Sequence, residues 1–203
     1  SECLVGSEMC IRDSKGQSHI LQYNYQDRLI INMGYSYHYN SIGGAIINNT
    51  IASNSYSIRF NFESAGNIMY ALSKATNIRK NNDGEYAILG IPYAQYVKGE
   101  FDFSKNIRID HRNSFAFHIG MGIAVPYGNA KTIPFEKQYF SGGANSVRGW
   151  TVRDLGPGSF VRDENTNLLD QSGDIKLDAS IEYRSKLFWK FQGAIFVDAG
   201  NIW

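Results

Sequence analysis

The sequence has little cysteine, almost no net charge and no long apolar run. Its two cysteines, Cys3 and Cys10, lie within the first ten positions with no downstream partner, so no redox compartment can be inferred from them. The formal net charge of +1 provides no basic face, and we expect no nucleic-acid partner. No apolar stretch approaches the roughly 18 residues that a membrane-spanning helix needs. A helical membrane protein is therefore excluded, whereas a β-barrel is not.

The first fourteen residues, SECLVGSEMCIRDS, differ in composition from the rest of the chain. They lack its richness in tyrosine and asparagine and show no regular period. The segment resembles the translated adapter peptide found at the ends of metagenomic reading frames, although a native strand or linker stays open. We expect residues 1–14 to be non-native and residues 15–203 to form the folded domain.

Apolar residues recur at every second position in several long segments, which predicts two-faced β-strands. In residues 114–125 one face carries Phe115, Phe117, Ile119, Met121, Ile123 and Val125, and the other carries Ser114, Ala116, His118, Gly120, Gly122 and Ala124. Residues 57–63 and 174–184 repeat this pattern. Further strands are expected at 19–26, 29–40, 92–103 and 191–202. The sequence thus predicts an all-β chain of about seven or eight strands, with no convincing amphipathic helix.

Alternation alone leaves two antiparallel architectures open, an outer-membrane barrel and a soluble β-sandwich. Three details favour the barrel. The polar face is charged and rich in glycine, the apolar strips reach about ten residues, and tyrosines cluster near strand ends in YSYHY, PYAQY and VPYG. Such tyrosines are typical of the aromatic girdles at membrane interfaces.

A glycine-rich segment, residues 139–160, interrupts the strand pattern. Its sequence YFSGGANSVRGWTVRDLGPGSF contains five glycines and two arginines. The alternation places Glu182 on the polar face of its strand, together with Lys176, Asp178 and Ser180, and places Asp198 on the polar face of the next strand. Because a guanidinium matches carboxylate geometry, we expect Arg148 to dock on Glu182 and Asp198, with Gly149 allowing a tight turn beside the barrel wall. A solvated loop arginine is the alternative.

The same segment resembles the loop signature of the outer-membrane β-barrel assembly factors, the BamA/TamA-like bacterial surface-antigen family. That signature is an Ile/Val-Arg-Gly-aromatic tetrad after a glycine pair. The residues that match the signature are Gly142, Gly143, Val147, Arg148, Gly149 and Trp150. Two further family elements follow in order, a strand with lumenal Glu182 (ASIEYR) and a strand FVDAGNIW with Asp198 and Gly200. The phrases GIPYAQYVKGEFDF, PYGN and RDLGPGSF are most similar to Bacteroidetes-type members, including TamL, the lipoprotein variant of TamA.

The resemblance implies a sixteen-stranded transmembrane barrel behind POTRA domains, of which this chain is an incomplete portion with a long inward-folded loop at 126–173. It also implies a bacterial outer-membrane location and a non-enzymatic role in inserting or translocating proteins, without cofactors. Its expected partners are the lipid bilayer, nascent outer-membrane proteins or translocated substrates, and other components of an assembly machinery. A two-partner-secretion transporter and the barrel of a patatin-like phospholipase fusion share this barrel and remain alternatives.

Other candidate sites are weaker. His118 lies among small residues on the polar face, but no nucleophile motif such as G-x-S-x-G accompanies it. His19, His38 and His111 show no metal-ligand spacing with one another, so we expect no metal site. All four histidines are expected to be polar residues of the lumen or the rim.

Overall fold

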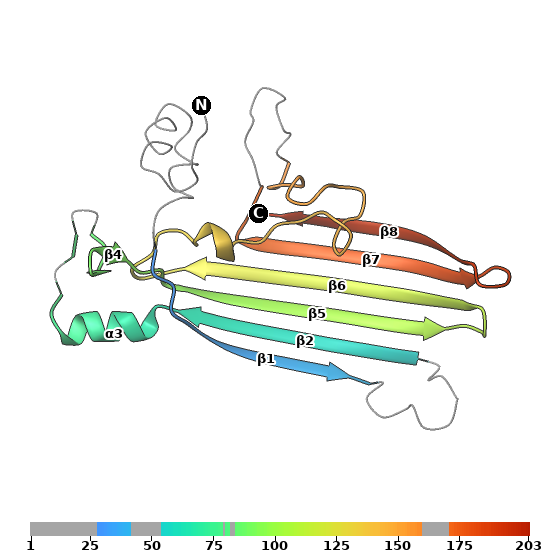
Figure 1. Ribbon diagram of the computed structural model, residues 1–203, viewed down its shortest axis with the longest axis horizontal. Helices are drawn as coiled ribbons and strands as arrows, with labels where there is room; N and C mark the ends of the chain where they lie inside the picture. Colours follow the sequence, from blue (N-terminus) through green and yellow to red (C-terminus); the bar gives the residue numbers. More distant parts are fainter. Residues whose placement is uncertain (1–27, 42–53, 79, 82–83, 160–170) are drawn as a thin grey trace.

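One antiparallel sheet dominates the structure (Figure 1). The computed structural model describes residues 28–41, 54–78, 80–81, 84–159 and 171–203. The strand expected at 19–26 and the segment 1–14 lie outside the described residues. The other strand predictions each fall on a strand of the main sheet, and the prediction of an all-β antiparallel fold is confirmed.

The main sheet has the order β1-β2-β5-β6-β7-β8, and every neighbouring pair is antiparallel. Its strands are β1 (Asn32–Asn40), β2 (Asn54–Ala65), β5 (Tyr96–Arg108), β6 (Asn113–Pro126), β7 (Ile175–Lys186) and β8 (Gln192–Ile202). Two short strands, β3 (Ala87–Ile88) and β4 (Ile91–Pro92), form a separate hairpin. Within the described residues β1 and β8 each pair on one side only, so the sheet is a partial barrel wall.

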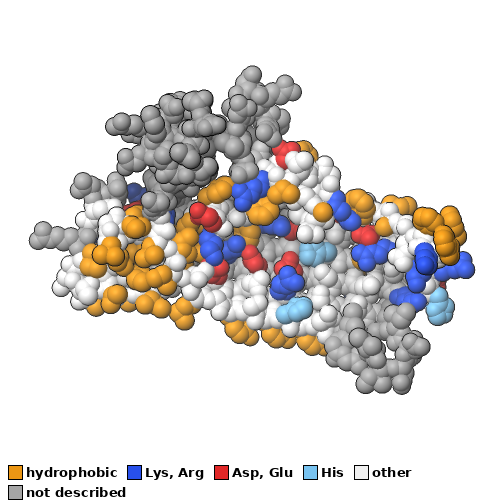
Figure 2. Space-filling model, viewed as in Figure 1, with side chains coloured by type: hydrophobic (Ala, Val, Ile, Leu, Met, Phe, Trp, Pro, Cys, Tyr) orange, Lys and Arg blue, Asp and Glu red, His pale blue; other side chains and the backbone are white. Residues whose placement is uncertain are grey.

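The two faces of the sheet show the reverse of the burial found in a soluble protein. Apolar side chains point outward: Val197 is 70% exposed and Met121 is 47% exposed. On the opposite face Asp178 is 4% exposed. Figure 2 shows charged side chains along the middle of one face, whereas apolar side chains line its lower margin. The apolar face that the sheet turns to the outside is suited to contact with the hydrocarbon of a membrane.

The register aligns polar residues into rows across the sheet. Asp102, Gly120, Asp178 and Gly200 lie opposite one another in successive strands, as do Ser104, His118, Ser180 and Asp198. A third row places Glu182 opposite Phe196. Because every second residue shares a face, these neighbouring rows form one continuous polar surface.

The two ends of the sheet differ in the length of their connections. Short turns join β5 to β6 at 109–112 and β7 to β8 at 187–191. At the other end, residues 66–95 join β2 to β5, and residues 127–174 join β6 to β7. Outer-membrane barrels carry short turns on the periplasmic side and long loops outside. We call the end with the turns 109–112 and 187–191 the short-turn end, where residues 41–53 also join β1 to β2, and the other end the long-loop end.

The buried core lies at the long-loop end, where the connections cover the polar face. It consists of Ala65, Ala94, Tyr96, Ala124, Ile133, Tyr139 and Ile202. The expectation that the tyrosines of PYAQY belong to an interfacial girdle is wrong, since Tyr93 and Tyr96 are 1% and 0% exposed. The Tyr96 hydroxyl donates a hydrogen bond to Glu63 Oε1 at 2.5 Å, which gives its polar end a partner inside this core.

The structure also contains helices that the sequence reading did not anticipate. Helix α3 (Asn67–Ala75) follows β2, and a 3-10 turn, η2 (Phe135–Lys137), lies in the connection between β6 and β7. Gly66 starts α3 in a left-handed conformation, with φ 77°, and a Cβ there would collide with the carbonyl oxygen of Ala94. Its apolar residues Ile68, Ala71, Leu72 and Ala75 do follow the helical spacing i, i+3, i+4 and i+7, although over little more than two turns. No helix in the described segments is long and apolar enough to cross a membrane.

Candidate functional site: a loop docked on the polar face

The connection between β6 and β7 folds back over the polar face near β7 and β8 (Figure 1). Its backbone forms isolated bridges between Tyr139 and Gly173 and between Ser141 and Leu155. The Gly143 N–H donates to the Trp150 carbonyl oxygen at 2.8 Å, which closes a compact tip around residues 143–150. The tip is therefore built by backbone hydrogen bonds rather than left as an open loop.

The glycine pair makes this tip possible. Gly142 has φ 101° and Gly143 has φ 86°, both in the left-handed region where side chains are disfavoured. A Cβ on Gly142 would collide with the carbonyl oxygen of Thr151, and one on Gly143 would lie 2.7 Å from Val152 Cγ2. Both positions thus require the absence of a side chain.

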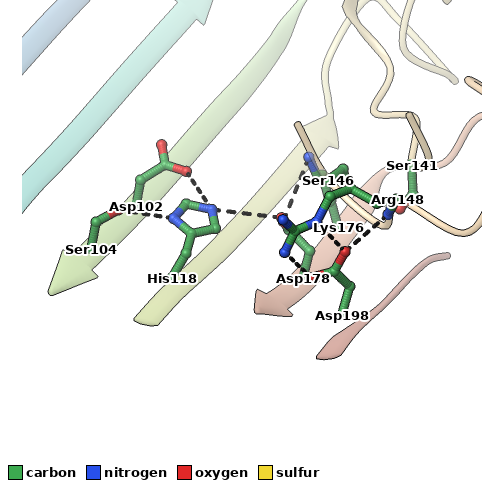
Figure 3. A network of polar contacts seen from close by, with 9 residues as sticks. All are labelled: Asp102, Ser104, His118, Ser141, Ser146, Arg148, Lys176, Asp178 and Asp198. Atoms are coloured by element: carbon green, nitrogen blue, oxygen red, sulfur yellow. Dashed lines mark hydrogen bonds and ion pairs between the residues drawn. The ribbon is translucent and has the colours of Figure 1, made fainter. Parts of the chain in front are cut away.

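Arg148 reaches from this tip to two carboxylates on adjacent strands. Its Nε and Nη2 donate to Asp198 Oδ2 and Oδ1, both at 2.7 Å, and its Nη1 donates to Glu182 Oε2 at 2.8 Å. Its backbone N–H adds a bond of 3.1 Å to Asp198 Oδ2. The structure thus brings together the three side chains that the sequence analysis selected. Figure 3 shows Arg148 beside Asp198, which it contacts in a bidentate geometry.

Phe196 is part of this site, and the sequence analysis did not select it. The Arg148 guanidinium carbon lies 3.6 Å from the centre of the Phe196 ring, in a cation–π arrangement. The signal was present in the alternation, because Phe196 shares its face with Asp198. A single phenylalanine among the polar residues of one strand face is thus a candidate to stack against an arginine.

The electrostatic environment of the guanidinium is strongly favourable. The side chains of Asp198, Glu182 and Arg148 are 4%, 15% and 26% exposed. Hydrogen bonds to Asp198 first, and then to Glu182, raise the pKa of Arg148 above its ordinary value. The Arg184 Nε also donates to Glu182 Oε1 at 2.6 Å, so Glu182 serves two arginines. Each carboxylate is therefore charge-compensated despite its low exposure.

Val147 and Gly200 add a steric contact beside the ion pair. Val147 is 7% exposed, and a Cβ on Gly200 would lie 2.9 Å from Val147 Cγ2. The same Cβ would lie 2.9 Å from the Leu177 carbonyl oxygen. Gly200 thus leaves the space that Val147 occupies.

Gly149 lies in a tight turn that the Trp150 backbone closes, but no wall crowds it. A Cβ on Gly149 would meet nothing within 4 Å, and its φ lies outside the left-handed region, so no wall crowds it. Trp150 is 50% exposed and does not bury its ring against the strands. Its N–H donates to the Val147 carbonyl oxygen at 3.2 Å. The glycines that shape the loop are therefore Gly142 and Gly143.

A second polar cluster lies beside the docked arginine (Figure 3). His118 Nδ1 is 3.0 Å from Ser104 Oγ, and its Nε2 is 3.7 Å from Asp178 Oδ2 and 3.9 Å from Asp102 Oδ1. Lys176 Nζ lies 3.5 Å from Asp178 Oδ1. The alternation put these residues on one face but did not reveal which rows align. In the part of the chain that the structure describes, no group of three or more His, Cys, Asp or Glu residues could hold a metal ion.

His38 and His111 do not join either cluster. His38 lies exposed on β1, and His111 lies in the exposed turn between β5 and β6. His19 falls outside the described residues.

The site as a whole holds the loop against β7 and β8 through ion pairs, the stacking of Arg148 on Phe196 and the fit of Val147 beside Gly200.

A sheet with an apolar outer face, a charged inner face and a loop folded onto that inner face defines a barrel wall of the outer-membrane class. The Omp85 superfamily domain model matches residues 13–203, and the chain belongs to that superfamily. It is a protein of the bacterial outer membrane.

This chain is similar to a curated relative and to a solved structure of known identity. The outer membrane protein assembly factor BamA of Neisseria meningitidis serogroup B is 36% identical over 92 residues, which are 41% of this chain and 11% of that protein. The crystal structure of BamA from Haemophilus ducreyi lacking POTRA domains 1–3 matches 86% of this chain and 42% of its own, with 17% identity and a TM-score of 0.44. The chain thus spans about a tenth of the length of the first and less than half of the second.

Proposed function

We propose that this chain forms part of an outer-membrane barrel that inserts or translocates proteins, and that the docked Arg148 loop positions the barrel wall for this task. The observation that carries the proposal is the bidentate contact of Arg148 with Asp198, extended to Glu182 on the neighbouring strand. One side chain thereby ties the loop to both β7 and β8. A change in either strand is coupled to the position of the loop.

The proposed action is mechanical and does not make or break covalent bonds. Tight ion pairs and stacking hold a conformation, and a barrel that admits substrate strands needs a wall of defined shape beside a weakly paired seam. The proposed partners are the lipid bilayer, nascent outer-membrane proteins or translocated substrates, and further assembly components. We also propose that the protein is not an enzyme and uses no cofactor.

Assembly is favoured here over the alternatives of two-partner secretion and a phospholipase fusion. The support is the relative from Neisseria meningitidis, whose name states a role in outer membrane protein assembly. We further propose that residues 15–203 are a portion of a sixteen-stranded barrel, that residues 1–14 are non-native, and that the protein is a Bacteroidetes-type member such as TamL.

The test is Arg148→Ala in the full-length protein, with Arg59→Ala as the matched control. Arg59 also lies on the polar face, directly opposite Asp102, but makes no hydrogen bond or ion pair within the described residues. We expect Arg148→Ala to leave the strand content unchanged, to expose residues 142–159 to protease and to lower the yield of folded outer-membrane proteins in cells. Arg59→Ala should change none of these. A protected loop with full assembly activity in Arg148→Ala would contradict the proposed role.

A further inference from the structure

The connection between β6 and β7 also contacts the polar face at a second place, away from Arg148. Tyr139 is 7% exposed and lies over Gly122 of β6, where a Cβ would come within 2.6 Å of the tyrosine ring. The Tyr139 hydroxyl donates a hydrogen bond to the Gly99 carbonyl oxygen of β5 at 3.0 Å. The ring therefore fills the space that a side chain at position 122 would take.

Charged side chains hold the same stretch of the connection on β2 and β5. Lys137 Nζ lies 2.8 Å from Glu63 Oε1, and Glu63 also accepts the hydrogen bond of the Tyr96 hydroxyl. Lys98 Nζ donates to the Lys137 carbonyl oxygen at 3.2 Å and lies 4.2 Å from the centre of the Tyr139 ring. We call Lys137 and Tyr139 the base clamp, because they attach the start of the loop to the sheet.

The loop leaves and returns at this clamp. The Tyr139 N–H donates to the Gly173 carbonyl oxygen at 2.8 Å, and the Gly173 N–H donates back to the Tyr139 carbonyl oxygen at 2.9 Å. Directly after Gly173, the Asp174 N–H donates to the Trp203 carbonyl oxygen at 2.6 Å, which fixes the returning chain beside the end of β8. None of these bonds involves Arg148, so its release leaves the junction intact.

The base clamp and the tip lie on different strands and at different levels of the sheet. The clamp contacts β2, β5 and β6, whereas Arg148 contacts β7 and β8. Gly122 pairs with Lys176, and Glu182 lies further along β7 by a distance of roughly 20 Å in an extended strand. Between these levels the polar face has a hollow of about 160 Å³ beside Tyr139. The two attachments are thus separate in space and share no partner.

We propose that Lys137 and Tyr139 are a second, independent attachment of the loop, which keeps its base on β2, β5 and β6 when Arg148 is released. Attachments that are far apart and share no partner contribute additively, so one opens without the other. Gly142 and Gly143 lie between the clamp and the tip and provide the hinge, since glycine tolerates large changes of φ and ψ. Movement of the tip then uncovers β7 and β8 alone. The inference concerns how the loop is held, and it does not require the assembly role.

The experiment measures distances in the full-length protein, in phosphatidylcholine nanodiscs, after its native cysteines have been replaced by serine. Nitroxide pairs join the exposed turn position His111→Cys to Glu136→Cys beside the clamp or to Asn145→Cys at the tip, both exposed. Double electron–electron resonance gives each distance distribution. We expect Arg148→Ala to broaden the distribution between 111 and 145 and to leave that between 111 and 136 narrow.

The clamp is tested by filling the space over Gly122. Gly122→Ala should broaden the distribution between 111 and 136, while the intact Arg148 keeps that between 111 and 145 narrow. Gly99→Ala is the matched control, because it also adds a methyl group to a strand glycine, but its Cβ would lie 4.0 Å from Ile123 Cγ2 in ordinary contact. Strand content from circular dichroism should be the same in both variants.

A milder variant keeps the proposal testable if Gly122→Ala does not fold. Lys137→Gln removes the ion pair with Glu63 and should broaden the distribution between 111 and 136 to a smaller degree. Lys131→Gln, at an exposed lysine of the same connection, should not. A distribution between 111 and 136 that broadens in Arg148→Ala would overturn the proposal, since the loop would then have one attachment. So would one that stays narrow in Lys137→Gln, or equal broadening in Gly99→Ala and Gly122→Ala.

Discussion

The two connections of β7 differ in the environment that each is built to meet. The connection before it, residues 127–174, turns inward and ends in a guanidinium held by Asp198 and Glu182. The turn after it, residues 187–191, extends outward and exposes Trp189. The first is held to the sheet by ion pairs, whereas the second is closed by backbone hydrogen bonds of its own, from the Leu187 N–H to the Phe191 carbonyl oxygen and from the Phe191 N–H to the Phe188 carbonyl oxygen, both at 3.0 Å. The inner face of this wall is polar, and the outer face is apolar and suited to contact with lipid hydrocarbon.

The comparison teaches that exposure alone does not identify a functional surface here. Val197 is more exposed than Arg148, yet the chemistry of the loop lies with Arg148. Position along the strand, taken with parity, separates residues that face lipid from residues that hold the loop. Changes to the two connections should accordingly affect different measurements.

The largest effect is expected from Gly142→Ala. A side chain at φ 101° is strained, and its Cβ would collide with the backbone of Thr151, so we expect loop docking to weaken by about 3 kcal/mol. Gly149→Ala is the matched control, since its Cβ would meet open space. Limited proteolysis of residues 142–159 in the full-length protein measures both. Equal protection in the two variants would show that the glycine pair does not shape the loop.

A smaller effect, about 1 to 2 kcal/mol, is expected from Gly200→Ala, because its Cβ crowds Val147 and the Leu177 carbonyl oxygen. Val147→Ala in the same chain should restore part of the loss by vacating the space beside Gly200. Loop protection is again the readout. If Val147→Ala adds its own loss in full, Val147 does not occupy the gap at Gly200.

The smallest effect concerns pH and the turn between β5 and β6. Hydrogen bonds from the backbone of Arg112, followed by those from Asn113, hold the pKa of Asp110 below its ordinary value of 3.8. A lowered folded-state pKa means that this stabilisation is present above about pH 4 and is lost as the pH falls through the folded pKa. The protection of the amides at 109–113, taken relative to their intrinsic exchange rate at each pH, should therefore fall in acid, while the protection at 187–191, which has no acid, should not respond in this way. Asp110→Asn should remove the difference in this protection between neutral and acidic pH.

Much of the fold and part of the site were accessible from the sequence, for identifiable reasons. Period-two alternation survives in long strands, so the faces of Glu182, Asp198 and His118 could be assigned without coordinates. The alternation cannot supply the register between strands. The proximity of His118 to Asp102 and Asp178 depends on that register, and was therefore not anticipated.

The features that were missed are set by packing rather than by period. Helix α3 shows its apolar spacing over little more than two turns and was overlooked between two strands. Tyr96 is buried because the long connections cover it. Gly149 was expected to allow a tight turn beside the barrel wall, and it lies in such a turn, but the glycines that exclude a side chain are Gly142 and Gly143, whose neighbours come from later in the loop. Such contacts between segments leave no local mark in the sequence.

The most direct test of the central claim is a charge-swap cycle between Arg148 and Asp198 in the full-length protein. Breaking a buried pair on one side costs about 3 to 5 kcal/mol, and the partial exposure of Arg148 places this pair near the lower end. We predict that Arg148→Glu exposes the loop to protease, that Asp198→Arg does the same, and that the double variant recovers part of the protection because the charges are again complementary. Losses that simply add, with no recovery in the double variant, would contradict the claim that Arg148 holds the loop to β7 and β8.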